Sequence, residues 1–289
     1  MKDFRLVVLA CLLTWVAGSV FAQSYETVKF DERYTAAKGK TLDIELDIDA
    51  GEVDVLPADS RDEVRVVMRY TEEAFREKVS FDEKRGRLRI QLDSRKWKKW
   101  RSYDSDNDER AEVTVYLPDG VDLYITSKIS AGDISMELGG LRLKEFSFTN
   151  FAGEVEVSFD TPNKVVMDML DINVKVGETR FLALGNARFR RADVNAGIGE
   201  MEVDFTGALE KGAKARVDLD IGEATVILPE ETGVRARIGG GLSFLSSKEI
   251  DYGLRKRGRA YINDAYQSDE DALMVSITPG LGELNVRLQ

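Results

Sequence analysis

The chain contains no histidine among its 289 residues. This absence removes the commonest general base and zinc ligand, and with it every Ser-His or Cys-His nucleophile pair. The only cysteine, Cys11, lies in an N-terminal apolar segment, so the rest of the chain lacks the residues for a disulfide, a thiol nucleophile or an iron–sulfur cluster. Prolines number only 5, which excludes a collagen-like or Pro-rich disordered chain. We expect a protein without a cofactor or a resident metal.

The chain also has fewer basic residues than acidic ones. Lys and Arg number 41 against 52 Asp and Glu, which gives a net charge of −11. Nucleic acids require a basic surface, so they are excluded as the main partner. The length permits one or two domains with a substantial core, and 43% hydrophobic residues suit a folded, acidic protein. No feature of the composition specifies an oligomeric state.

The first 22 residues have the pattern of a signal peptide. Lys2 and Arg5 precede an apolar run, and Val20-Phe21-Ala22 supplies small or apolar residues before a cleavage point. The apolar stretch at 6–22 is shorter than the roughly 20 residues that span a bilayer comfortably. We expect cleavage after Ala22 and export to the periplasm or cell surface, with no membrane span in the mature chain. The alternative is an uncleaved membrane anchor.

Apolar residues alternate with polar ones along nearly the whole chain, which predicts strands with one buried face. Val64, Val66 and Met68 show this period of two, as do the segments at 88–93 and 113–118. Only the segment at 72–83 leaves two alternatives open, a short helix or a charged turn followed by a strand. The pattern predicts an all-β fold.

A short word recurs along the chain: a small or apolar residue, a glycine, an acidic residue and then alternating apolar positions. The copies begin Ala50-Gly51-Glu52, Ala131-Gly132-Asp133, Ala152-Gly153-Glu154, Val176-Gly177-Glu178, Ile198-Gly199-Glu200, Ile221-Gly222-Glu223 and Leu281-Gly282-Glu283. From Gly132 to Gly222 the glycines are 21, 24, 22 and 23 residues apart. A period of this length indicates a solenoid, and each unit holds the strand of the word plus at least one further strand.

The repeat predicts how side chains are placed. Glycine suits the corner of each coil, where the backbone turns or is crowded. Val155, Met201 and Ala224 are expected to form one inward column, with the acids Glu154, Glu200 and Glu223 exposed beside them. Parallel neighbours stacked about 4.8 Å apart would produce this arrangement.

The repeat also divides the chain. We expect a β-sandwich-like cap at residues 23–120 and a β-solenoid at 121–289. A polar insertion at about 243–271, which carries Tyr252, Tyr261 and Tyr266, interrupts the solenoid. The word at Gly282 is predicted to close the stack.

Three stretches carry a resemblance to known families. Residues 112–121, followed by the word at Ala131, resemble the bacterial "putative-adhesin" domain of unknown function. Residues 197–241, and the ending at 268–286, resemble the toast-rack domain found in LiaF-like response regulators of the cell envelope. The resemblance implies a single-stranded, right-handed β-helix-like stack and a role in envelope homeostasis, adhesion or assembly. It supplies no catalytic residues. LiaF-type regulators usually carry membrane helices before this domain, and this chain has only a signal sequence there.

One cluster of residues is a candidate binding site. The segment Arg95, Lys96, Trp97, Lys98, Lys99, Trp100 and Arg101 holds five cations and two tryptophans. Exposed cations beside indole rings bind anionic lipid headgroups or glycans. The partner would be a cell-envelope component, whether anionic lipid, glycan or protein. The alternative is a solvated loop whose cations pair with the acids that follow, Asp104, Asp106, Asp108 and Glu109.

Two further readings concern carboxylates. The run at 104–108 has calcium-like spacing, but Glu109 and Val115 stand where an EF-hand needs glycine and an acid, so the pattern favours a charged loop. The acids of the repeat words favour a solvated face over a cation site. We therefore interpret the chain as a non-catalytic envelope binding or scaffold protein, adhesin-like or linked to envelope stress. The alternative is a β-helix enzyme acting on acidic polysaccharide, because such enzymes can work without histidine.

Overall fold

The computed structural model describes residues 27–37, 39–95, 111–239 and 246–289. Its strands are β1 (Thr27–Thr35), β2 (Leu42–Ala50), β3 (Glu52–Pro57), β4 (Glu63–Thr71), β5 (Phe75–Asp82), β6 (Arg87–Ser94), β7 (Ala111–Leu117), β8 (Leu123–Glu137), β9 (Leu143–Ser158), β10 (Met167–Leu182), β11 (Phe189–Asp204), β12 (Lys214–Leu228), β13 (Val234–Ile238), β14 (Ser246–Ile250), β15 (Arg255–Arg257), β16 (Ala260–Ile262) and β17 (Leu273–Leu288). One 3₁₀ turn, η2, spans Leu184–Ala187, and no α-helix occurs in the described ranges. The predicted all-β solenoid is confirmed.

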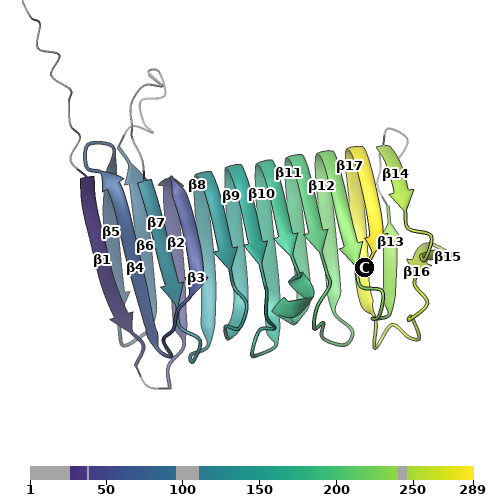
Figure 1. Cartoon of the computed structure of the whole chain (residues 1–289), viewed down its shortest axis with the longest axis horizontal. Coiled ribbons are helices and arrows are strands. Elements are labelled where there is room, and N and C mark those ends of the chain that lie inside the picture. The colour runs from purple at the N-terminus through teal and green to yellow at the C-terminus, as the bar shows by residue number, and fades with distance from the viewer. Residues whose placement is uncertain (1–26, 38, 96–110, 240–245) are drawn as a thin grey trace, which may run out of the picture.

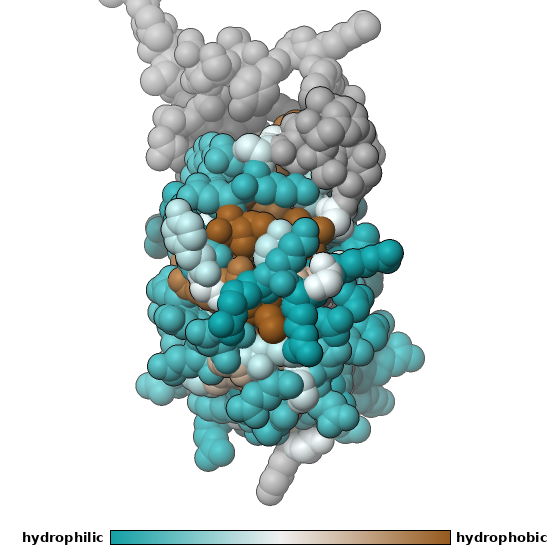
Figure 2. All heavy atoms as spheres, turned by 90° about the vertical axis from the view of Figure 1, so that its right-hand side faces the viewer, coloured by the Kyte–Doolittle hydropathy of each residue, from teal (hydrophilic) through white to brown (hydrophobic). Residues whose placement is uncertain are grey.

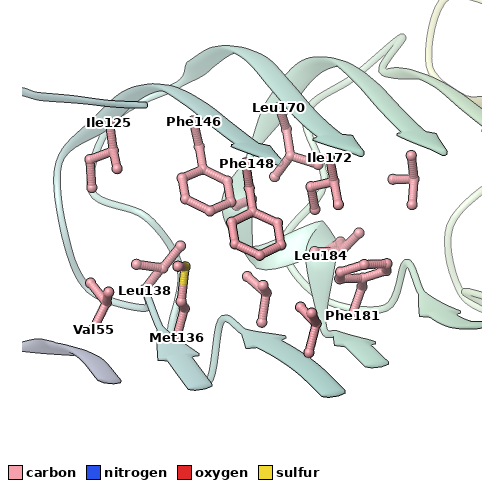
Figure 3. Close-up of a cluster of buried hydrophobic side chains, with 14 of the residues drawn as sticks. Val55, Ile125, Met136, Leu138, Phe146, Phe148, Leu170, Ile172, Phe181 and Leu184 are labelled. Carbon is pink, nitrogen blue, oxygen red and sulfur yellow. The ribbon is translucent and has the colours of Figure 1, made fainter. Parts of the chain in front are cut away.

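The strands form a row of parallel rungs, in which one rung is one level of the stack (Figure 1). Strands β8 to β12 and β17 are 15 or 16 residues long, and each makes a whole rung by bending once in its middle. The word and the strand before it are therefore two halves of one continuous strand. Side chains from the two halves point toward one another across the core (Figure 3).

A column of glycines marks the bend. Gly132, Gly153, Gly177, Gly199 and Gly222 stand in register on neighbouring strands, and Gly282 continues the column beyond Gly222. Their φ angles lie between 134° and 144°, a region that side chains other than glycine rarely adopt. A Cβ on any of them would stand 1.8–1.9 Å from the carbonyl oxygen of the preceding glycine. Glycine is thus required both by the conformation and by the close approach of the next backbone.

The predicted inward column is also confirmed. Val155, Met201 and Ala224 are 2–3% exposed and lie on neighbouring parallel strands. In β10 the position between Val155 and Met201 is occupied by the buried Thr179, whose hydroxyl donates to the Glu200 carbonyl oxygen at 3.2 Å. Phenylalanines fill the centre of the stack, among them the fully buried Phe146, Phe148, Phe159, Phe181, Phe189 and Phe205.

At the N-terminal end, the chain order differs from the spatial order. Strands β2 and β3 form a rung that pairs with β8 on one side and with β6 and β7 on the other. Beyond them, β5 pairs antiparallel with β6, β4 antiparallel with β7, and β1 antiparallel with β4. Of the two alternatives for residues 72–83, the turn followed by a strand is correct. The proposed domain boundary at residue 120 stays a prediction, with β2 and β8 paired directly in the sheet.

At the C-terminal end, the expectation that the Gly282 word closes the stack is wrong. Strand β17 lies between β12 and a further rung formed by β13 and β14. The chain places that outer rung first, makes the β15–β16 hairpin, and returns to fill the gap (Figure 1). The physical reason is that a terminal β17 would leave a full-length row of N–H and C=O groups unpaired. Part of the predicted insertion therefore belongs to the stack itself.

Buried asparagines hold the connections at the edge opposite the bend. Asn163 is 1% exposed, and its Nδ2 donates to the carbonyl oxygens of Leu143 at 2.8 Å, Val165 at 2.8 Å and Ala187 at 3.3 Å. Its Oδ1 accepts from the Leu143 N–H at 2.9 Å. Asn263 makes the same kind of bonds near the C-terminal end. These side chains satisfy backbone groups that lie beyond the strand ladders.

Candidate binding surfaces

The cationic segment predicted as a binding site lies mostly outside the described residues. Lys96, Trp97, Lys98, Lys99, Trp100 and Arg101 fall there, as does the acidic run at 104–108. Arg95 is described and exposed, directly after β6. Its N–H donates to the Ala74 carbonyl oxygen at 2.7 Å, and its Nε donates to the Phe75 carbonyl oxygen at 3.1 Å. Arg95 therefore anchors the start of the segment to the turn before β5.

The two described strands that flank that segment, β6 and β7, end and begin at the bend edge of the stack. Strand β6 pairs with β2 and strand β7 pairs with β3, so the connection between β6 and β7 starts and ends beside the Gly51 bend. A Cβ on Gly51 would stand 2.5 Å from the carbonyl oxygen of Ala111, the first residue of β7. The chain between β6 and β7 is thus longer than the single-glycine bends of β8 to β12 and of β17.

The acids of the repeat words form a ladder along this edge. Asp133, Glu154, Glu178, Glu200 and Glu223 stand in register and are exposed, and Glu283 continues the row. At the N-terminal half an open hollow of about 190 Å³ lies over the ladder, lined by Glu52, Asp54, Asp133, Ile134, Ser135, Glu154, Val155, Glu156, Glu178 and Arg180. In the described part of the chain, no group of three or more His, Cys, Asp or Glu side chains has the geometry of a metal site. The ladder presents repeated negative charge to solvent.

An apolar ridge runs beside the acid ladder, one residue before the bend glycines of β10, β11 and β12. Val176, Ile198 and Ile221 stand in register and are 47%, 52% and 45% exposed. Phe151, also exposed, lies under the Lys128 ammonium, which is 5.9 Å from the ring centroid. The sequence word carried the signal, since it begins with an apolar residue in each of these copies. Sequence reasoning did not predict that the position would be exposed.

A second hollow, of about 430 Å³, lies at the opposite, loop edge of the stack. Its lining includes Arg61, Arg142 and Lys164. Arg142 pairs with Asp122 at 2.7 Å, and Lys164 pairs with Asp119. Because two of these cations already have carboxylate partners, the hollow presents little net positive charge.

The most perturbed titratable group is Tyr70, in β4. Burial is the main cause that raises the pKa of its phenol, and the hydrogen bond that Tyr70 donates to Glu77 adds to the rise. Tyr70 is 2% exposed and its hydroxyl is engaged by that carboxylate. The pair links β4 to β5 at the N-terminal end and is partly buried, and it lines neither of the two hollows, so its role is structural.

Comparison with family models decides the classification. Residues 22–169 match the model described as "N-terminal domain of toast_rack, DUF2154". The chain belongs to the toast-rack family. This confirms the resemblance inferred from the sequence words, and it agrees with the bent-strand rungs described above.

Solved structures similar to this toast-rack chain come from several bacteria. A "putative cell adhesion protein" from Clostridium sporogenes is 16% identical with a TM-score of 0.48, over 91% of this chain and 100% of that chain. A "putative adhesin" from Bacteroides fragilis is 10% identical with a TM-score of 0.40, over 91% and 98%. A "putative lipid binding protein" from Parabacteroides distasonis is 11% identical with a TM-score of 0.32, over 89% and 96%. A search of curated proteins found no match. Within the described ranges, the toast-rack chain has no helix long and apolar enough to cross a membrane.

Proposed function

We propose that this toast-rack protein is an exported, non-catalytic binding or scaffold module of the cell envelope, adhesin-like or linked to envelope stress. The observation that carries the proposal is the repetition of one exposed surface along the stack. The acid ladder and the apolar ridge present the same chemistry on the three neighbouring rungs β10, β11 and β12. Repeated surfaces of this kind suit an extended partner better than a small substrate, which needs a few convergent groups in one pocket.

We assign the main contact to the segment from Arg95 to Arg101. Its five cations are a local exception in a chain of net charge −11. Within a Debye length of about 8 Å at physiological salt, an anionic surface interacts mainly with such a patch. The contact of Arg95 with Phe75, and the pairing of Ala111 at the start of β7 with Tyr70, support a contact at the bend edge. The partner class is an anionic envelope component, which would contact this segment and not the acid ladder, because the ladder carries charge of the same sign.

The enzyme alternative is disfavoured on electrostatic grounds. The carboxylate-rich hollow contains Arg180 as its single basic lining residue among many acids. An acidic polysaccharide would meet like charge there, and like-charge contact opposes binding. An enzyme of this class would need cations around its catalytic carboxylates.

The experiment that tests the proposal measures binding of the chain from Gln23 onward to isolated envelope fractions. Replacing Lys96, Lys98, Lys99 and Arg101 with glutamine should weaken binding and flatten its dependence on salt. The matched control replaces Lys144, Lys175, Arg191 and Lys214, which are partly or fully exposed along the middle of the stack. Equal binding of the first variant and the unmodified protein would refute the assignment. Mass spectrometry of native protein tests export, since an intact Met1 would contradict cleavage after Ala22.

A further inference from the structure

The C-terminal end of the stack carries a second cationic surface, separate from the segment at 95–101. Strands β15 and β16 form a hairpin that pairs with β13, with Arg235 opposite Ile262 and Ala236 opposite Tyr261. The hairpin bears Arg255, Lys256, Arg257 and Arg259, all of them exposed. Four cations in five successive residues are a local exception in an acidic chain.

Several of these cations are available to a partner. Arg255 pairs with Asp264, but Lys256, Arg257 and Arg259 make no ion pair with any carboxylate in the described ranges. The nearby Asp269 is already engaged, because it accepts a hydrogen bond from the Tyr266 hydroxyl at 2.7 Å and pairs with Arg235. These contacts hold the pKa of Asp269 below its ordinary value, with the Tyr266 hydrogen bond as the largest cause. Its charge is therefore committed to its present partners.

Apolar side chains lie beside the cations. Figure 2 views this end of the stack and shows a hydrophobic area at its centre, crossed and surrounded by hydrophilic side chains. Ile238, Ile250 and Leu288 at this end are only partly buried against the core, as is Tyr261 of β16. Tyr252, just before the hairpin, is fully exposed. Among the described residues, the end of the core is thus only partly covered and is bordered by cations.

The chemistry of this end discriminates among possible occupants. A second copy of the chain would bring identical cations together, and exposed cations on a terminal strand oppose edge pairing. An anionic polysaccharide would neutralise the cations but leave the aliphatic side chains in water. A membrane surface with anionic headgroups satisfies both, because cations contact the phosphates while tyrosine and aliphatic side chains enter the interfacial layer.

We propose that the hairpin end, comprising Tyr252, Lys256, Arg257, Arg259 and the apolar side chains Ile238 and Ile250, docks on an anionic lipid surface. The stack would then stand with its C-terminal end on the bilayer. Strand β6, which precedes the segment at 95–101, lies toward the other end of the row (Figure 1). This inference does not depend on the function assigned to the segment at 95–101.

The test is cosedimentation with vesicles of phosphatidylcholine, with or without a quarter of phosphatidylglycerol. We expect binding only to the vesicles with phosphatidylglycerol, and release at high salt. The variant K256Q/R257Q/R259Q should bind about 100-fold more weakly, since each cation near an anionic surface contributes about fivefold. The variant Y252S should bind more weakly with an unchanged salt dependence.

The matched control, K175Q/R191Q/K214Q, removes the same charge from exposed positions in the middle of the stack and should bind like the unmodified protein. A variant with glutamine at 96, 98, 99 and 101 should retain vesicle binding, which separates this surface from the proposed envelope contact. Equal binding by K256Q/R257Q/R259Q and the control would overturn the proposal. So would equal binding to both kinds of vesicle, no vesicle binding at all, or retention on an acidic polysaccharide alone.

Discussion

The carbonyl oxygen of Gly199 lies 1.8 Å from the place where a Cβ on Gly222 would stand. The two residues occupy the same position on β11 and β12, and both have φ angles in the region that glycine alone adopts readily. The contact between these backbones lets each long strand turn from one wall of the stack to the other. It is repeated at the bends of β8 to β12 and of β17, so one residue type determines the shape of these rungs.

The substitution Gly222→Ala should therefore destabilise the protein severely. The strained φ and the clash with a backbone oxygen together cost about 3 kcal/mol or more of unfolding free energy. Gly239→Ala is the matched control, because a Cβ there meets nothing within 4 Å. Urea unfolding followed by circular dichroism gives the unfolding free energies of the two variants. A Gly222→Ala protein as stable as the control would mean that the bend adapts to a side chain.

Two phenylalanines close in sequence should respond very differently to truncation. Phe148 is fully buried between the two walls, whereas Phe151 is 45% exposed at the bend (Figure 3 shows Phe148). Phe148→Ala should cost about 3–5 kcal/mol, because it leaves a cavity in the centre of the stack. Phe151→Ala should cost less than about 1 kcal/mol, mainly from its contact with Lys128. Urea midpoints of the two variants measure the two losses of stability. Equal losses would contradict the assignment of Phe148 to the core and of Phe151 to the surface.

Asn163 should be sensitive even to an isosteric change. Its amide donates to three carbonyl oxygens, and a carboxylate there would turn an acceptor toward all of them. Asn163→Ala should cost about 2–4 kcal/mol through the unpaired backbone groups that it leaves. Asn163→Asp should destabilise more at neutral pH than at acid pH, where the added carboxyl is protonated. Unfolding curves at two pH values test this, and identical values for Asp and Asn would show that the amide donors do not matter.

The alkaline stability of the protein should depend on Tyr70. Burial and Glu77 raise the pKa of Tyr70 above its ordinary value of 10.0, so the folded chain keeps a proton that the unfolded chain releases. The contribution of this group is complete below pH 10.0 and is lost as the pH rises through the folded pKa. Tyr70→Phe should therefore make the stability fall less steeply above that pH. Urea titrations at increasing pH give the fall of unfolding free energy with pH for both proteins. Equal falls in the two proteins would refute the raised pKa of Tyr70.

The elements that sequence predicted share one property, which is that neighbouring residues alone specify them. The glycine of each word, the acid after it and the alternation at Val155 and Val157 fix a corner, an outer face and an inner face without reference to distant residues. A repeat brings equivalent positions together automatically, so the register of Glu154 with Glu178 and Glu200 followed from the spacing.

The exposed ridge and the C-terminal hairpin needed the structure. An isoleucine such as Ile198 satisfies the sequence pattern of a core residue, and only the bend turns it outward. The sequence places the cations at Arg255–Arg259 only in a polar insertion. The structure shows that they lie on a hairpin paired with β13 at the C-terminal end of the core.

The sequence by itself determined the all-β solenoid, the glycine bends, the inward column and the acid ladder. These features arise from local conformational preference and a period of about one rung, both of which are written in the chain. The tertiary structure alone decided that β2 and β3 stack between β6–β7 and β8, and that β17 enters between β12 and β13–β14. Rungs with the same pattern can pair with one another in any order. The rung that lies outermost is the one that best covers the unpaired strand edges and the exposed core side chains at the end of the stack.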